Sequence, residues 1–231
     1  MPATLFFDLD RTLCRPRIPF TEIFTNSCAP LLASRAVSFQ SLMNAWAATL
    51  EEPGPSTMAG CLARALDACG IAAPRHLVEQ CIQSLNAAWA EAQALDDGVA
   101  DTLAHLAGRY PLGLITNGPN DGQRAVITTL RLDDTFRWRI VSGDADIGIR
   151  KPGRGIFQRA RAMSGSLPED TWYIGDSPVN DIAGAKGAGW RACWIAPADR
   201  DFPADVAAPD ARIARLDELP QVISRYEQSH L

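Results

Sequence analysis

Polar residues that could do chemistry follow several apolar runs of the 231-residue sequence, where predicted strands end. The carboxyl ends of parallel strands meet at one edge of a sheet, so these residues can share a single crevice. They are four carboxylates, a hydroxyl, an amide and one lysine: Asp8, Asp10, Thr116, Asn117, Lys151, Asp176 and Asp181. The set contains no histidine and therefore offers oxygen ligands together with one cation.

Four carboxylates in one crevice repel one another unless a cation binds among them. Oxygen ligands without imidazole or thiolate favour a hard ion. Mg²⁺ is the natural candidate, because it keeps several waters and is completed by the phosphate oxygens of a substrate. Carboxylates also act as covalent nucleophiles in aspartyl-phosphate enzymes. These residue types indicate phosphoryl transfer with Mg²⁺ as the cofactor.

Strands and helices alternate over most of the chain, which is typical of parallel βαβ units. Apolar runs predict strands at 4–7, 111–115, 137–142, 172–174 and 190–195. Helical spacing predicts helices at about 99–109, 120–131, 154–163, 178–187 and 216–226. The expected fold class is α/β, with a doubly wound, Rossmann-like parallel sheet.

A segment with a helical sequence pattern separates the first predicted strand from the others. Alanine, leucine and glutamine recur at helical spacing in four blocks, at about 20–36, 38–51, 56–69 and 75–93. The expected helix starts are Ser38, Ser56 and Pro74. Four helices with short connections form a bundle. We expect a helical cap domain over residues 15–94, inserted into a core domain made of residues 1–14 and 95–231.

Composition narrows the function classes. The chain has 22 basic and 27 acidic residues and a net charge of −5, which argues against a nucleic acid polymer as partner, because phosphate backbones require a clustered positive field. No run approaches the ~18 apolar residues of a membrane span. The N-terminus lacks the pattern of a signal peptide, so we expect a cytoplasmic protein without a membrane partner. Six scattered cysteines without a Cys-x-x-Cys pair do not form a zinc pattern.

Four motifs resemble those of the haloacid dehalogenase-like hydrolase superfamily. They are Asp8-Leu9-Asp10-Arg11-Thr12-Leu13, Thr116-Asn117-Gly118, Lys151-Pro152 and Gly175-Asp176-Ser177-Pro178-Val179-Asn180-Asp181. Each motif alone also fits a turn or a helix cap, but four in this order, with a helical insertion after the first, are specific. Arg11 departs from the commonest family version, which has glycine there.

The resemblance implies a role for each acid of the first and fourth motifs. Asp8 would attack phosphorus and become the aspartyl-phosphate. Asp10 would protonate the leaving oxygen and then activate the water that hydrolyses the intermediate. Mg²⁺ would be bound by Asp8, by the backbone carbonyl of Asp10 and by Asp176.

The remaining motif residues would hold the substrate. Thr116 and the backbone around Asn117 and Gly118 would bind phosphate oxygens. Lys151 would balance the charge on the nucleophile and the phosphate. Asp181 would steady Lys151.

The acid at Asp10 also discriminates within the family. The dehalogenase branch has no acid there, because a halide leaves without protonation. The prediction is a Mg²⁺-dependent phosphatase acting on a small phosphomonoester, a nucleotide or sugar phosphate, with the pyrimidine 5′-nucleotidase type first. A phosphomutase and a non-catalytic metabolite-binding regulatory module are the alternatives. The oligomeric state is left open between monomer and homodimer.

Two further groups of residues have an open interpretation. One of the aromatic residues of the cap could stack on a substrate ring, although core packing is the commoner role: Phe20, Phe24, Phe39, Trp46 and Trp89. Arg15 and Arg17 follow the first motif, where the family has a mobile flap. They could contact a second anionic group of the substrate or lie in a solvated loop.

Overall fold

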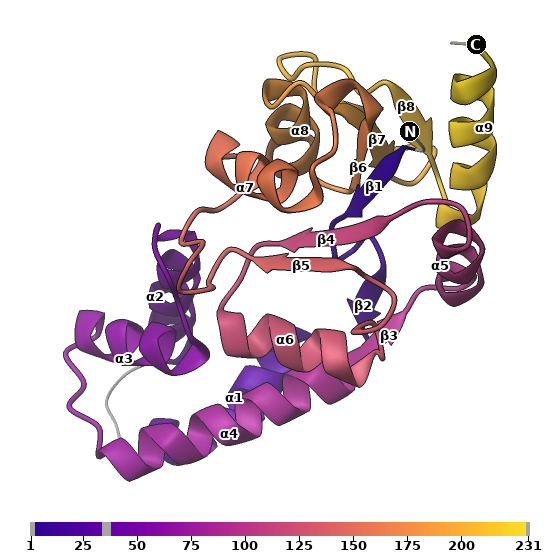
Figure 1. Cartoon of the computed structure of the whole chain (residues 1–231). Helices are drawn as coiled ribbons and strands as arrows, with labels where there is room; N and C mark the ends of the chain where they lie inside the picture. Colours follow the sequence, from indigo (N-terminus) through magenta and orange to yellow (C-terminus); the bar gives the residue numbers. More distant parts are fainter. Residues whose placement is uncertain (1–2, 34–37, 230–231) are drawn as a thin grey trace.

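Six parallel strands form the central sheet, in the order β5-β4-β1-β6-β7-β8 (Figure 1). The computed structural model describes residues 3–33 and 38–229. The strands are β1 (Thr4–Phe7), β4 (Leu112–Thr116), β5 (Trp138–Val141), β6 (Thr171–Gly175), β7 (Arg191–Ile195) and β8 (Ala211–Ile213). β1 lies in the middle, between β4 and β6. The predicted doubly wound sheet is confirmed, and β8 is an edge strand that the sequence analysis did not predict.

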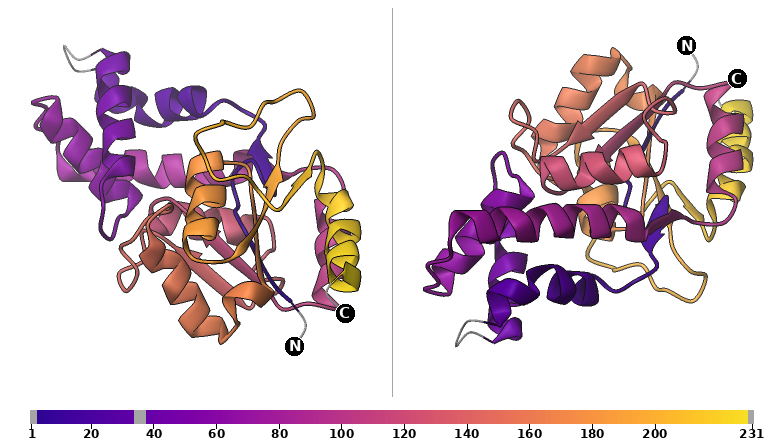
Figure 2. Two further views of the ribbon diagram at one scale, coloured as in Figure 1. Left: turned by 90° about the horizontal axis from the view of Figure 1, so that it is seen from above. Right: turned by 90° about the horizontal axis from the view of Figure 1, so that it is seen from below.

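Helices cover each face of the sheet, as in a doubly wound fold. The layer on one face is α5 (Val99–Ala107), α6 (Asn120–Thr129) and α9 (Leu219–Ser229). The layer on the other face is α7 (Arg154–Ser164) and α8 (Gly184–Gly187). Figures 1 and 2 show α5 and α9 side by side at one end of the sheet.

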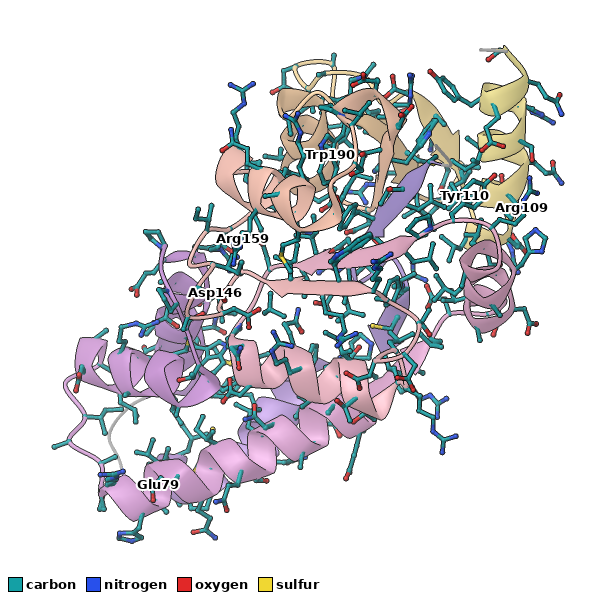
Figure 3. The ribbon with its side chains drawn as sticks, in the orientation of Figure 1. Glu79, Arg109, Tyr110, Asp146, Arg159 and Trp190 are labelled. Atoms are coloured by element: carbon teal, nitrogen blue, oxygen red, sulfur yellow. The ribbon has the colours of Figure 1, made fainter. Side chains whose placement is uncertain are left out.

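The central strand β1 is buried on both sides. Leu5 and Phe7 pack on the α5 side and Phe6 on the α7 side, as the alternation along a strand requires. The ring centre of Phe6 lies 5.1 Å from that of Trp190, a residue labelled in Figure 3. A Cβ on Gly113 of β4 would lie only 2.2 Å from Cε1 of Phe6, so glycine makes room for this ring.

Two predicted helices are built differently. The segment expected as a helix at 178–187 is a wide π-helical turn, η2 (Pro178–Ala183), followed by α8. The carbonyl of Ser177 accepts from the N–H groups of both Asp181 and Ile182, which widens this turn. The segment expected at 216–226 is a 3-10 turn, η3 (Leu216–Glu218), followed by α9, and a further 3-10 turn, η1 (Pro168–Asp170), precedes β6.

The described part of the inserted segment forms four helices with a hydrophobic cluster of their own. They are α1 (Phe20–Leu32), α2 (Phe39–Glu51), α3 (Met58–Ala68) and α4 (Arg75–Ala92). Ser38 caps α2 as predicted, whereas Thr57 and not Ser56 caps α3. The expected end of the first helix, residues 34–36, lies outside the described residues. The two domain boundaries stay a prediction.

Two short strands join the inserted helices to the sheet. β2 (Cys14–Pro16) pairs antiparallel with β3 (Gln93–Leu95), so the segments that enter and leave the insertion lie side by side. Neither strand was predicted. In the described part of the chain no helix has the length and apolarity that crossing a membrane requires.

The inserted helices also contact the core directly. α4 packs along α6, as the right-hand view of Figure 2, seen from below, shows. Asp121 at the start of α6 accepts a hydrogen bond from the backbone N–H of Met58 at 2.8 Å and from Nδ2 of Asn86 at 3.2 Å. These contacts hold α3 and α4 over the carboxyl ends of the strands.

Candidate active site

The carboxyl ends of β1, β4 and β6 open into a cavity of about 540 Å³, which residues of α1 and α4 line from the other side. All predicted site residues except Gly118 line it: Asp8, Asp10, Thr116, Asn117, Lys151, Asp176 and Asp181. Gly118 lines an adjoining cavity of about 240 Å³, which shares Asp10 and Asn117 with the first. The structure thus brings the four motifs together.

Lys151 is the buried cation of the cavity and is only 4% exposed. Its ammonium donates to Oδ1 of Asp8 at 2.6 Å and to Oδ1 of Asp181 at 2.7 Å. The third hydrogen goes to the hydroxyl of Tyr173 at 2.8 Å, and this hydroxyl donates to the carbonyl of Ile115 at 2.8 Å. All three ammonium hydrogens are used, which fixes the carboxylate of Asp8 in one orientation.

Asn117 holds the backbone that carries Lys151. Its Oδ1 accepts from the backbone N–H of Lys151 at 2.9 Å, and its Nδ2 donates to the Lys151 carbonyl at 3.0 Å. The N–H of Gly118, which the resemblance assigns to phosphate, instead donates to Oγ of Ser142 at 3.0 Å. Phosphate binding by Gly118 therefore stays a prediction.

Burial and charge act in opposite directions on the acid–lysine cluster. The pKa of Asp8 is raised to about 8, chiefly by burial, although the ammonium of Lys151 lowers it. Burial alone would lower the pKa of Lys151, but the carboxylates of Asp181 and Asp8 raise it above its ordinary value. Because the two groups touch at 2.6 Å, we assign the charged pair, with an ionised Asp8. An ionised carboxylate is the form that can attack phosphorus.

Two further carboxylates approach Asp8. Asp8, Asp176 and Asp181 each place one oxygen within 4.8 Å of the other two. Both oxygens of Asp181 are engaged, one by Lys151 at 2.7 Å and the other by the N–H of Ser177 at 2.9 Å. Compared with Asp181, Oδ2 of Asp8 and the carboxylate of Asp176 have fewer or longer hydrogen bonds to the described residues. Burial raises the pKa of Asp176, and a cation between the two groups would favour their ionised forms. This all-oxygen set fits Mg²⁺.

Gln123 on the first turns of α6 is a buried site residue that the sequence analysis missed. Its Nε2 lies 2.7 Å from Oδ2 of Asp10, 2.7 Å from Oγ1 of Thr116 and 3.0 Å from the carbonyl of Asn117. The carboxyl of Asp10 is therefore held by a neutral amide and not by Lys151. The available signal was a glutamine on the buried stripe of this helix, next to Val126 and Ile127.

The aromatic residues and arginines whose roles the sequence left open differ in whether they line a cavity. Phe20 and Trp89 line both cavities and Trp46 lines the smaller one, whereas Phe24 and Phe39 line neither. Arg15 forms an ion pair with Asp96 at 2.8 Å, and neither Arg15 nor Arg17 lines the larger cavity. The arginines on its wall are Arg11 and Arg200.

A site of buried carboxylates around one lysine, at the carboxyl edge of a parallel sheet, defines a hydrolase of the phosphoryl-transfer or dehalogenation type. A family model described as haloacid dehalogenase-like hydrolase matches residues 2–189. The chain belongs to this family, and the predicted family and enzyme class are confirmed.

Relatives with known names include two phosphatases. Phosphoserine phosphatase of Thermus thermophilus is 38% identical over 110 residues, which cover 47% of this chain and 42% of the relative. Pyrimidine 5′-nucleotidase YjjG of Escherichia coli is 28% identical over 130 residues, 56% of each chain. The chain thus spans about half the length of these relatives.

A solved structure resembles nearly the whole chain. The 2-haloacid dehalogenase of Pseudomonas syringae pv. Tomato is 27% identical, with a TM-score of 0.75 over 98% of this chain and 100% of that one. The magnesium-bound YfnB of Bacillus subtilis has a TM-score of 0.66 at 24% identity, which shows the shared fold.

Proposed function

We propose that this protein is a Mg²⁺-dependent phosphomonoester hydrolase that forms an aspartyl-phosphate on Asp8. The observation that carries the proposal is a pair of acids in unlike surroundings. Asp8 contacts the ammonium of Lys151 at 2.6 Å, whereas Asp10 accepts from the amide of Gln123 at 2.7 Å. Two carboxyl groups in different environments can divide the tasks of nucleophile and proton donor.

The reaction would proceed in two steps. First, an oxygen of Asp8 bonds to phosphorus while the bond from phosphorus to the leaving oxygen breaks, and Asp10 gives that oxygen its proton. Then a water attacks phosphorus and loses a proton to Asp10, the bond between phosphorus and the Asp8 oxygen breaks, and inorganic phosphate leaves. Lys151, held by Asp181, stays charged and offsets the negative charge on the nucleophile and the phosphoryl group. Thr116 contributes its hydroxyl to a phosphate oxygen.

Asp8 and Asp176 would hold the metal, with the backbone carbonyl of Asp10 as the further protein ligand that the resemblance implies. Bound Mg²⁺ supplies positive charge to the phosphoryl oxygens. The oxygens of Asp8, Asp176 and Asp181 within 4.8 Å of one another support this assignment.

The substrate would be a small metabolite. Phe20 of α1 and Trp89 of α4 close the cavity opposite the sheet, and about 540 Å³ suits a small molecule. The names of the relatives, phosphoserine phosphatase and pyrimidine 5′-nucleotidase, support phosphorylated metabolites as the class. Nucleotides and sugar phosphates are the first substrates to test.

A 2-haloacid dehalogenase is the second candidate, favoured by the structural neighbour of that name at 27% identity. In that reaction an ionised Asp8 would displace a halide from carbon. A halide leaves without a proton, so this chemistry gives no task to Asp10. The half-buried acid at Asp10 and its hydrogen bond to Gln123 therefore favour the phosphatase.

The test measures phosphate release from a panel of phosphomonoesters, with Mg²⁺ and with chelator, by the wild type and Asp8→Asn. Chloride release from 2-chloropropionate is measured in parallel. Mg²⁺-dependent phosphate release that is lost in Asp8→Asn supports the proposal. Chloride release without phosphate release would establish the dehalogenase. Isomerisation of a sugar phosphate without phosphate release would establish the phosphomutase, and inactivity on every substrate would favour the binding module.

A further inference from the structure

Arg11 lies in a backbone conformation that favours glycine. It follows Asp10 in a tight turn, where its N–H donates to the carbonyl of Cys14 at 2.8 Å, and its φ is 64°. A side chain in this left-handed region costs free energy that glycine avoids. Among the described residues the guanidinium of Arg11 has neither an ion pair nor a hydrogen bond. No ion pair or hydrogen bond of the Arg11 guanidinium with the described residues therefore offsets the free-energy cost of its positive φ.

Arg200 reaches the same cavity from the loop between β7 and β8. Its guanidinium lies over the ring of Trp194, 5.6 Å from the ring centre. Trp194 is itself fixed, because its Nε1 donates to the carbonyl of Asp176 at 2.9 Å. Within the described ranges Arg200 has no ion pair at contact distance, although the charges of both arginines act on the carboxylate of Asp176. The ring of Trp194 thus holds a second unpaired cation beside Asp176.

Unlike Lys151, the two arginines have hydrogen-bond donors that remain available to a ligand. Lys151 is buried and its three hydrogens are taken by Asp8, Asp181 and Tyr173. Arg11 and Arg200 are exposed and line the cavity at its solvent side. The transferred phosphoryl group must lie against the buried Asp8, so an anion bound by the arginines would be a different group of the substrate.

We propose that Arg11 and Arg200 form a subsite for a second anionic group of the substrate, a carboxylate or another phosphate. The inference rests on the proposed phosphatase function and narrows its substrates to phosphomonoesters with a second negative charge. Guanidinium groups bind carboxylates and phosphates through paired, charge-assisted hydrogen bonds. Phe20 and Trp89 on the opposite wall carry no charge and can contact the apolar part of the substrate.

The experiment compares two phosphonates of nearly equal shape as inhibitors of p-nitrophenyl phosphate hydrolysis. Phosphonoacetate carries a carboxylate, and acetonylphosphonate carries a neutral methyl ketone at the same place. We expect the wild type to bind phosphonoacetate about 10- to 100-fold more tightly, as one or two charge-assisted hydrogen bonds allow. The ratio compared is the inhibition constant of acetonylphosphonate divided by that of phosphonoacetate. In Arg11→Gly this ratio should fall to within about threefold of one, and Arg200→Gln should lower it as well. Glycine suits the φ of Arg11, so this variant keeps the turn.

Arg17→Gln is the matched control, since Arg17 is an exposed arginine of the same segment that does not line the cavity. It should keep the wild-type ratio. A wild-type ratio near one, a ratio unchanged in both cavity variants, or an equal loss of both inhibitors would overturn the subsite. Absence of phosphate release from p-nitrophenyl phosphate and from every other phosphomonoester of the panel would instead contradict the proposed function. Calorimetric titration with the same two phosphonates gives the ratio without turnover and separates the two outcomes.

Discussion

The side-chain amide of Gln123 lies 2.7 Å from Oδ2 of Asp10 and joins the proposed proton donor to Thr116 at the end of β4. The same Nε2 atom lies 2.7 Å from Oγ1 of Thr116. Gln123 is buried, with 5% of its surface exposed, so these contacts are shielded from competing water. The amide therefore fixes the direction of the Asp10 carboxyl, the proposed proton donor.

Replacing Gln123 with leucine keeps the volume of the side chain and removes the donor. We expect kcat/KM for alkyl phosphates to fall by about 10²-fold, on the scale of losing general acid catalysis. The value for p-nitrophenyl phosphate should fall by less than about tenfold, because p-nitrophenolate leaves without needing a proton. The measurement is kcat/KM for both kinds of ester at one pH with saturating Mg²⁺.

The control is Val126→Ala, a buried position on the same helix that faces the hydrophobic core. It should lower the free energy of unfolding without changing the ratio between the two esters. An equal fall for both esters in Gln123→Leu would show that the glutamine only supports the fold.

Lys151 is the cation that neutralises the buried carboxylates of Asp8 and Asp181. In Lys151→Met the carboxylates of Asp8 and Asp181 lose their cation, and we expect a loss of about 3–5 kcal/mol in the free energy of unfolding together with loss of turnover. The double variant Lys151→Met with Asp181→Asn removes one of these stranded charges. It should recover part of the stability and none of the activity, as measured by urea unfolding without added metal and by phosphate release with Mg²⁺. A Lys151→Met variant as stable as the wild type would contradict the assignment of a charged pair.

The elements that the sequence located are those with long or strongly apolar patterns. Strands such as 4–7 and 172–174 are buried on both faces and end in polar residues, and the strand-end rule then places Asp8 and Asp176 at one edge. β2, β3 and β8 have three residues each, which is too short to show an alternation. β8 forms by pairing with β7, and β2 and β3 pair with each other where the two ends of the insertion meet, and a sequence pattern does not contain that information.

The part of the site that the sequence did not provide depends on tertiary contacts. Gln123 is 113 positions from Asp10, and its contact requires α6 to turn one particular face toward β1. Ser142 takes the N–H of Gly118 only because β5 pairs with β4. The motif resemblance supplied the acids and the lysine, but the neutral groups that hold them appear only in the folded arrangement.

Metal binding can be tested without turnover. Asp176 offers a carboxylate with no protein hydrogen bond among the described residues, beside Asp8. We expect millimolar Mg²⁺ to raise the melting temperature of the wild type, since a ligand bound only by the folded state stabilises by about 2.7 kcal/mol at 100 times its Kd. Asp176→Asn should lose most of this shift, while the melting temperature in chelator should be at least that of the wild type, because one of three neighbouring acids that repel one another is gone. An undiminished Mg²⁺ shift in Asp176→Asn would place the metal elsewhere.

Gly175, the last residue of β6, controls the position of Asp181. A Cβ on Gly175 would lie 2.4 Å from Cγ of Asp181, closer than packed atoms allow, so Asp181 must move away in Gly175→Ala. Asp181 then releases Lys151, and the loss of alignment at Asp8 should reduce turnover by about 10²-fold, as for a displacement of about 1 Å in an active site. The overpacking should cost about 1–3 kcal/mol in the free energy of unfolding.

The matched control for Gly175→Ala is Gly187→Ala. Gly187 ends α8, and an added Cβ there meets no described atom within 4 Å. We expect this variant to keep wild-type turnover and to change the free energy of unfolding by less than about 1 kcal/mol. Both alanine variants are compared by phosphate release and urea unfolding. If Gly175→Ala kept wild-type turnover, Asp181 would not be needed to hold Lys151, and the ammonium would be positioned by Asp8 and Tyr173 alone.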